Sequence, residues 1–242
     1  MNKAHYIIFH PDHGRQQTPV QAIAMAQGQV LKNWGGNIYV DRIGIGNEDP
    51  FVFNDPWLYS YCHASQLRRN FRQNNNYLQV GSKIFFVSGQ QADKGFLTID
   101  TVFLIGGVQP WDNKSTLQLP VKYQHHFQDN MSILWRRHFR FPFHGNHDTV
   151  SHTYEAELWQ KNKTDFSFLP LDENNERVSI PFDKFSNDLL NKIAGKVKGK
   201  YPVLLSDKEL NIITTQIEKQ VATKILKIIT SKLVLTSKKA RC

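Results

Sequence analysis

Residues 78–107, LQVGSKIFFVSGQQADKGFLTIDTVFLIGG, form a strongly β-prone stretch. Two apolar runs within it, residues 83–87 and 97–105, are rich in β-branched and aromatic side chains. A polar segment with glycines and glutamines separates the two runs. Two buried strands joined by a connection have this pattern. We therefore predict that these strands form the middle of a sheet.

The N-terminal region has the pattern of a βαβ unit. Residues 5–9, HYIIF, predict a short buried strand, and residues 37–43 predict another. Between them, residues 18–21, TPVQ, make a helix-capping box with proline at the first helical position. Apolar side chains then recur mostly at helical spacing until the glycine pair at 35–36 ends the run. Strand, capped helix and strand in this order suggest a right-handed crossover.

The net charge of +9 is confined to the last quarter of the chain. Residues 184–242 hold 13 of the 30 lysines and arginines but only 4 of the 21 acidic residues, so the preceding part is neutral. Such a basic region points to a polyanionic partner, either nucleic acid or an anionic membrane surface. Two helices are predicted here, over residues 183–198 and 206–235, and the second begins with the capping box SDKE at 206–209.

Together these patterns predict a mixed α/β fold. It consists of the N-terminal βαβ unit, a central mixed or partly barrel-like sheet, and a helical C-terminal tail. We divide the chain into an α/β core domain, residues 1–182, and a basic helical C-terminal region, residues 183–242. The apolar stripe of the long helix, from Leu210 to Leu233, lacks the Trp and Phe typical of interfacial membrane helices. It is expected to pair with a protein partner or a second copy, or to pack against the core domain.

Composition excludes several classes of protein. The chain has two cysteines, Cys62 and Cys242, so neither a disulfide framework nor a cysteine-based zinc site is available. No apolar run approaches the roughly 20 residues that cross a bilayer. The first ten residues lack the apolar length of a signal peptide. We expect a cytoplasmic protein without a membrane span, in which any divalent metal would be bound by histidines and carboxylates.

A polar loop containing His10, Asp12, His13 and Arg15 follows the first predicted strand. Free backbone N–H groups and the dipole of a helix that begins nearby favour an anion at such a position. Arg15 is therefore a candidate to bind a phosphate through two hydrogen bonds, and His13 is a candidate catalytic residue. The alternative is a solvated polar loop with a Pro-Asp turn.

The densest group of histidines lies in residues 143–152, FHGNHDTVSH. His144, His147 and His152 are candidate ligands of a divalent metal, and His144, His147 and Asp148 are candidate catalytic groups. The GNHD segment at 145–148 resembles an element of the calcineurin-like metallophosphoesterases. That family's early Asp-x-His, its GDxxD motif and its late GHxH motif are absent from the sequence. The alternative is an exposed polar loop.

Two further groups combine basic and aromatic side chains. Tyr61, His63, Gln66 and Arg68 suit a nucleotide pocket, with His63 as a catalytic candidate and Arg68 as a ligand-binding one. Packing beside a solvated arginine face is the alternative. Residues 135–141, WRRHFRF, suit single-stranded nucleic acid, and an amphipathic strand with an arginine face is the alternative. The candidate nucleic-acid contacts are Arg68, Arg69, Arg72, Arg136, Arg137 and Arg140.

The central stretch also resembles a known group of domains. Residues 80–86, VGSKIFF, and the strand ending in TVFLIG at 101–106 are similar to the core of PUA-like barrels such as ASCH and EVE domains, and of nucleotide-modification-associated domains. The resemblance covers residues 62–107, and Ser82 stands where those families usually have Asp. It implies a partly barrel-like sheet that binds a nucleotide or nucleic acid.

Three hypotheses about function follow. The leading one is a protein that binds nucleic acid or nucleotides, either as a binding protein alone or as an enzyme of DNA or RNA modification or processing. The second is a metal-dependent hydrolase of small phosphorylated substrates that uses the same histidines. The third is a non-enzymatic interaction protein that pairs through its C-terminal helix.

Overall fold

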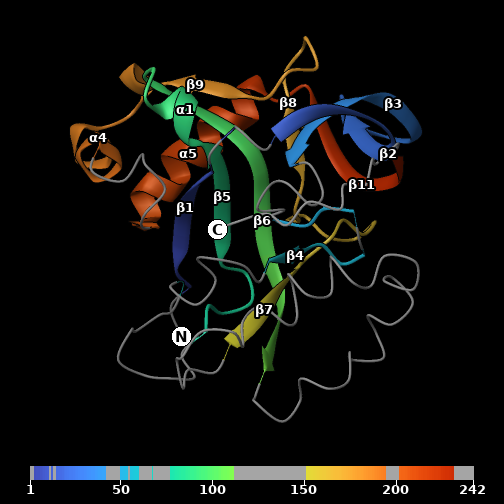
Figure 1. Ribbon diagram of the computed structural model, residues 1–242, viewed down its shortest axis with the longest axis horizontal. Helices are drawn as coiled ribbons and strands as arrows, with labels where there is room; N and C mark the ends of the chain where they lie inside the picture. The colour runs from blue at the N-terminus through green and yellow to red at the C-terminus, as the bar shows by residue number, and fades with distance from the viewer. Residues whose placement is uncertain are drawn as a thin grey trace, which may run out of the picture.

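A computed structural model describes residues 3–10, 12, 15–41, 50–53, 55–59, 67, 77–111, 151–194 and 202–231. Strands prevail in this part of the chain and form two sheets. Figure 1 shows the main sheet in the middle, with helices α1, α4 and α5 gathered on one side and the second sheet on the other. None of the described helices is both long enough and apolar enough to cross a bilayer.

Within the described residues, the main sheet has seven strands in the order β10-β1-β5-β6-β7-β4, and β9 pairs with β6. The central strands β5 and β6 are the two strands predicted from residues 78–107. They run antiparallel, and α1 lies in the polar connection between them. Strand β1, also predicted, runs parallel to β5. The bounds are β1 His5–His10, β4 Leu58–Tyr59, β5 Lys83–Ser88, α1 Gly89–Ala92, β6 Phe96–Trp111, β7 Ser151–Ala156, β9 Ser179–Pro181 and β10 Val203–Leu205.

The second sheet corrects the prediction of an N-terminal βαβ unit. Its described strands have the order β3-β2-β11-β8, with bounds β2 Arg15–Ala26, β3 Gln29–Asp41, β8 Leu169–Leu171 and β11 Thr223–Ser231. Strands β2 and β3 form an antiparallel hairpin over the residues predicted to be helical. The predicted mixed α/β fold is therefore wrong, because strands dominate the described residues, although the strand predicted over residues 37–43 coincides with the end of β3 over residues 37–41.

The period of burial in β2 explains the correction. Thr18, Val20, Ala22 and Ala24 are buried, whereas the side chains between them are exposed or half-buried. This alternation has the period of a strand. The turn at residues 27–28 has positive φ at both positions, 50° and 75°, as in the two-residue turns that match the twist of a hairpin.

The predicted long C-terminal helix is also wrong in its second half. Helix α5, Asp207–Gln220, begins with the predicted capping box, but the chain then continues as strand β11. That strand pairs with β2 on one side and β8 on the other, and its β-branched residues suit this position. Ile213 and Ile217 of α5 are buried in the core. The described part of the apolar stripe is therefore largely core rather than a free docking face.

Elements after residue 183 belong to both sheets. The predicted helix that follows is present as α4, Asn187–Ala194, after a short 3-10 turn at Phe182–Lys184. Strand β10 pairs with β1 in the main sheet, and β11 is an inner strand of the second sheet. The domain boundary at residue 183 remains a prediction, but the chain beyond it is not a helical tail.

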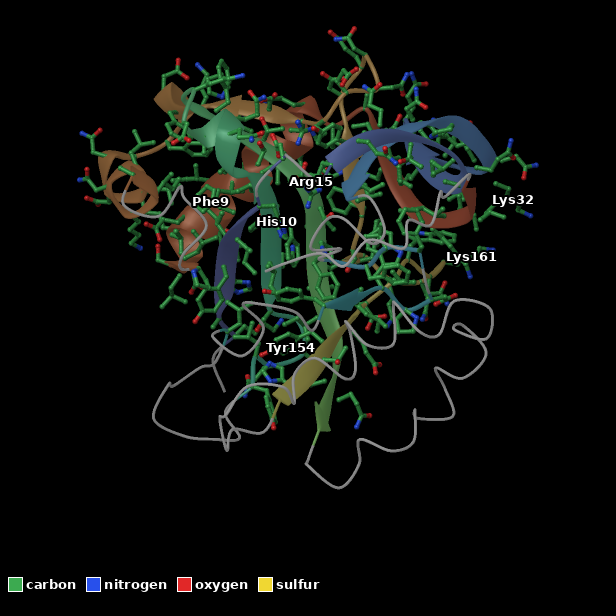
Figure 2. The ribbon with its side chains drawn as sticks, viewed as in Figure 1. Phe9, His10, Arg15, Lys32, Tyr154 and Lys161 are labelled. Carbon is green, nitrogen blue, oxygen red and sulfur yellow. The ribbon has the colours of Figure 1, made fainter. Side chains whose placement is uncertain are left out.

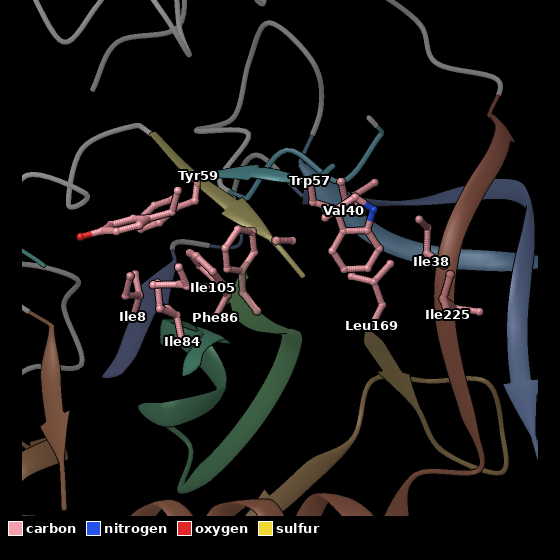
Figure 3. Packing of buried hydrophobic residues seen from close by; sticks show 14 of the residues in the cluster. Ile8, Ile38, Val40, Trp57, Tyr59, Ile84, Phe86, Ile105, Leu169 and Ile225 are labelled. Carbon is pink, nitrogen blue, oxygen red and sulfur yellow. The ribbon is translucent and has the colours of Figure 1, made fainter. Parts of the chain in front are cut away.

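Two hydrophobic clusters fill the interior. Successive side chains of β1 and β5 point to opposite faces of the main sheet, so each of these strands contributes residues to both clusters. One cluster contains Ile7, Phe85 and the buried residues of α4 and α5. The other contains Ile8 and Phe86 and extends to the second sheet. Figure 3 shows Trp57 in that second cluster among residues of several strands, with Ile38, Val40, Leu169 and Ile225 around it.

The cap of α5 provides a testable contribution to stability. Glu209 accepts hydrogen bonds from the Ser206 backbone N–H at 2.7 Å and from Lys192 Nζ at 2.7 Å. Burial alone would raise the pKa of Glu209, but these hydrogen bonds outweigh it and hold the pKa below its ordinary value. The ionised carboxylate therefore stabilises the fold above the ordinary pKa of Glu, and this stabilisation is lost as the pH falls through the lower pKa of the folded state.

We expect Glu209→Gln to lower the free energy of unfolding by about 1.5 kcal/mol near neutral pH, because it removes hydrogen bonds to a charged group. The difference from the unmodified protein should shrink as the pH falls below the pKa of a free glutamate. Urea unfolding at several pH values measures both effects. Glu218→Gln, at a half-exposed carboxylate near the end of the same helix, is the control. A difference that did not change with pH would contradict this account.

Candidate functional site

Polar side chains gather where the parallel strands β1 and β5 end. His10 and Ser88 are the last residues of these strands and are paired in register. Asp12 follows β1 and accepts a hydrogen bond from the Ser88 hydroxyl through Oδ2. The same hydroxyl accepts a hydrogen bond from the Gln91 backbone N–H at 3.1 Å, so Ser88 also caps α1. Polar contacts thus link the C-terminal ends of β1 and β5.

A β-bulge in β6 places Asp100 in this region. Phe86 pairs with Thr101 and the next residue, Val87, pairs with Ile99, so Asp100 is an extra residue on β6. Bulges of this kind redirect a side chain and are frequent beside functional sites. The carboxylate of Asp100 has no exposed surface. A buried charge in an otherwise apolar strand therefore requires partners nearby.

Two arginines supply these partners. Arg15, at the start of β2, places Nη1 3.4 Å from Asp100 Oδ2 and is 3% exposed. Arg177, between β8 and β9, places Nη1 2.8 Å from Asp100 Oδ1 and 3.8 Å from Asp12 Oδ1. Four charged side chains from three parts of the chain thus form one group, which we call the Asp100 cluster: Asp12, Arg15, Asp100 and Arg177. Its formal net charge is zero.

Tyr39 of β3 provides an aromatic surface beside the cluster. The Arg177 guanidinium carbon lies 3.8 Å from the centroid of the Tyr39 ring, within the range of a cation–π contact. Burial raises the pKa of the Tyr39 hydroxyl, so this side chain is neutral at physiological pH. The cluster therefore combines carboxylate acceptors, guanidinium donors, the Ser88 hydroxyl and an aromatic face.

The electrostatics of Asp100 are set chiefly by its burial. Removal from water raises its pKa, and the opposite influence of Arg15 and Arg177 does not fully offset this. Asp100 Oδ2 and Asp12 Oδ1 accept no hydrogen bond from any described residue. Each of these oxygens instead faces a guanidinium at longer range, since Asp100 Oδ2 lies 3.4 Å from Arg15 Nη1 and Asp12 Oδ1 lies 3.8 Å from Arg177 Nη1.

Two residues of the predicted His10–Arg15 loop belong to the cluster. These are Asp12 and Arg15, and Figure 2 labels Arg15 and also His10, the last residue of β1. Strand β2 follows the loop, so the expected contribution of a helix dipole is wrong. Arg15 faces Asp100 instead of an open space, and a phosphate would have to compete with this buried carboxylate. The remaining candidate of the loop, His13, lies outside the described residues.

Most other predicted site residues also lie outside the described part of the chain, so their roles remain predictions. They are His63, Arg68, Arg69, Arg72, Arg136, Arg137, Arg140, His144, His147 and Asp148. Of the predicted metal ligands, His152 alone is described. It is buried in β7, and its ring centroid lies 4.7 Å from that of Tyr77 and 4.5 Å from that of Tyr154. In the described ranges, no three histidine, cysteine or carboxylate side chains are grouped as a metal site would require.

His152 belongs to a row of aromatic rings on one face of the main sheet. Tyr59 stacks on Tyr154, with 6.3 Å between ring centroids, and meets Phe86 edge-on at 4.9 Å. Phe86 in turn contacts His10, whose ring centroid is 5.2 Å away. The row therefore connects β7, below in Figure 2, with the strand end that leads to the Asp100 cluster.

Sequence analysis did not identify Asp100, Arg177, Tyr39 or Ser88 as site residues. For Asp100 a signal exists, because it is the only charged residue within the apolar run 97–105. A lone carboxylate in a buried strand implies partners, although the sequence does not say which. The other three residues carry no comparable local signal, since tertiary contacts alone bring them to the site.

Comparisons with known proteins assign no family to this chain. No protein-family model matches it, and no curated protein or solved structure shows significant similarity to it. The resemblance to PUA-like and nucleotide-modification-associated domains therefore remains a prediction. The function has to be argued from the Asp100 cluster and from the distribution of charge.

Proposed function

We propose that this protein binds nucleic acid or a nucleotide, and that the Asp100 cluster with Tyr39 forms the part of the site that holds a base. The observation that carries this proposal is the buried Asp100 carboxylate on a bulge, surrounded by arginines and an aromatic ring. Proteins bind unpaired bases by stacking them on aromatic or arginine side chains and by hydrogen bonds to their polar edges. Because the cluster has no net charge, it suits the edge of a base better than a phosphate.

Phosphate contacts are assigned to the C-terminal quarter, where the net positive charge lies. Four of its described lysines already have acidic partners: Lys184 pairs with Asp183, Lys192 with Glu209, Lys224 with Glu218 and Lys227 with Asp55. A shallow groove along α5 has two lysines and no acidic residue in its lining. Its lining residues are Lys184, Lys208, Asn211, Ile212, Thr215 and Gln216. Cations and uncharged donors in such a groove suit the backbone of a nucleic acid.

The proposal predicts salt-dependent binding of single-stranded oligonucleotides. Each phosphate neutralised by a lysine releases counterions, so the logarithm of the binding constant should fall linearly with the logarithm of the salt concentration. Lys208→Gln is expected to reduce the slope by about 0.7 on a single strand, as for one lost phosphate contact. Fluorescence anisotropy of labelled DNA and RNA between about 50 and about 200 mM salt measures both quantities.

The matched control is Lys94→Gln, which removes the same charge at an exposed turn between α1 and β6. It should leave the slope unchanged. Absence of binding at the lowest salt concentration, or binding that does not respond to salt, would refute the proposal. Equal effects of both variants would show that only the net charge matters and would remove the groove along α5 from the site.

We also infer a cytoplasmic location. The support is compositional: two cysteines cannot form the disulfide framework typical of many small secreted domains. A nucleic-acid partner is consistent with this location.

A further inference from the structure

The Arg177 guanidinium contacts Tyr39, Asp12 and Asp100, and we call the space that it fills between them the Arg177 pocket. Its flat face lies on the Tyr39 ring at 3.8 Å, and its Nη1 faces carboxylate oxygens of Asp100 at 2.8 Å and of Asp12 at 3.8 Å. A planar group with N–H donors at its edge thus lies on an aromatic ring and against two carboxylates. The same arrangement suits any planar ligand that offers adjacent N–H donors.

Arg177 is the outermost member of the cluster. Its side chain is 15% exposed, whereas those of Asp12, Arg15 and Asp100 are 7%, 3% and 0% exposed. Arg177 lies in a short hairpin, residues 171–177, in which Leu171 and Arg177 form a β-bridge. Within this hairpin, Asp172 Oδ1 accepts hydrogen bonds from the backbone N–H groups of Asn174 and Glu176. These contacts do not involve the Arg177 side chain, so its displacement would leave them in place.

Arg177 does not satisfy the pocket completely. Asp100 Oδ2 and Asp12 Oδ1 accept no hydrogen bond from any described residue, although both side chains are more than nine-tenths buried. A buried oxygen that accepts no hydrogen bond lowers the stability of the fold. Asp12 Oδ1 and Asp100 Oδ1 face Arg177, so a ligand that replaces the guanidinium can donate N–H groups to them, whereas Asp100 Oδ2 faces Arg15.

Among the four common bases, guanine alone presents adjacent N–H donors on its Watson–Crick edge, at N1 and at the exocyclic amino group. These atoms belong to a planar guanidine unit within the ring system, so guanine reproduces both the donor edge and the flat shape of the Arg177 side chain. The corresponding edges of adenine and cytosine place an acceptor beside the amino group, and that of uracil has a single donor between two acceptors. Carboxylates accept hydrogen bonds and therefore discriminate between these edges.

We propose that the pocket formed by Tyr39, Asp12 and Asp100 binds guanine, and that guanine displaces Arg177 from it. This inference rests on the proposed binding of nucleic acid or nucleotides and names the base that the site selects. The ring of the base stacks on Tyr39, and its N1–H and amino groups donate to the two carboxylates. Displacing Arg177 removes a cation from two buried carboxylates, so the unmodified protein is expected to bind guanine weakly.

The experiment uses Arg177→Ala in the full chain, with GMP, AMP, CMP and UMP as ligands in isothermal titration calorimetry. Removing the side chain opens the pocket, so GMP should bind this variant about ten-fold more tightly than the unmodified protein, within the range known for a bidentate base contact. The other three nucleotides should show no comparable gain. Glu173→Ala, at an exposed position of the same hairpin, should leave all four affinities unchanged.

Arg177→Lys provides a second variant if the alanine variant does not fold. Lysine retains a cation beside Asp100 but lacks the planar, forked donor group. GMP should again gain affinity relative to the unmodified protein, by a smaller factor. N-ethylguanidinium, which restores the missing group, should compete with GMP for the alanine variant.

The inference is overturned if neither variant gains affinity for GMP, or if all four nucleotides gain equally. In that case, persistence of salt-dependent oligonucleotide binding would leave the proposed function intact. Loss of oligonucleotide binding by the unmodified protein would refute the proposed function itself. The two failures are thus distinguished by separate measurements.

Discussion

Asp100→Ala is expected to lower the free energy of unfolding by about 3–5 kcal/mol, the range measured when one partner of a buried ion pair is removed. The substitution removes the carboxylate that lies 3.4 Å from Nη1 of Arg15, a side chain that is only 3% exposed. Arg177 loses its 2.8 Å contact and retains only the longer one to Asp12. Removing a carboxylate from beside a buried cation costs more than losing the same attractive contact in water.

Urea unfolding followed by tryptophan fluorescence measures this effect. Asp93→Ala is the control, because it removes the same charge at an exposed position near the end of α1 and should change stability by no more than about 0.5 kcal/mol. The double variant Arg15→Met with Asp100→Leu should be less destabilising than Asp100→Ala, since it removes both charges and retains apolar volume. A loss below about 1 kcal/mol for Asp100→Ala would instead show that water reaches the cluster.

Truncation after Asp183 is expected to abolish folding. It removes β10, α5 and β11, and with them buried side chains that include Leu205, Ile213, Ile217 and Ile225. Complete burial of such a side chain contributes about 1.5–3 kcal/mol. Burial of these four side chains contributes about as much free energy as the typical net stability of a protein, about 5–15 kcal/mol. The second sheet would also lose the strand that joins β2 to β8.

Circular dichroism and size-exclusion chromatography test this expectation. The truncated chain should aggregate or lack a cooperative thermal transition. A shorter truncation, after Ser231, retains every described element and should remain folded. A monomeric chain of residues 1–183 that unfolds cooperatively would contradict the expectation, and would support the C-terminal region as a separate association module.

The main errors of the sequence analysis have a common physical cause. The capping box at residues 18–21 and the apolar spacing up to Trp34 are local helix signals, yet β2 and β3 form a hairpin there. The second error is the predicted helix over the residues of β11. There Val221, Ile225 and Ile228 continue the apolar stripe of α5, but β11 has register shifts after Ile225 and after Ile228. Such irregularities interrupt the two-residue alternation of a strand, so the pattern of apolar residues resembles a helix.

The candidate site was predictable only in part. The polar loop between residues 10 and 15 contains Asp12 and Arg15, which both belong to the Asp100 cluster. Arg177, however, lies 77 residues from Asp100 in the chain, and the two meet because β8 and β9 pack beside β6. The bulge that directs Asp100 into the cluster depends on its pairing with β5. No local pattern specifies such a pairing.

The sequence by itself determined the central strands β5 and β6, strand β1, the capped start of α5 and the concentration of positive charge near the C-terminus. These features depend on composition and on contacts between residues close in the chain. Long-range contacts were needed to make strands of β2 and the first part of β3, to end the helical path before β11, and to bring Asp100 to two arginines beside Tyr39. The reason is energetic, because burial between two sheets outweighs the small helix preference of a local segment. A buried carboxylate acquires its partners only when distant segments pack around it.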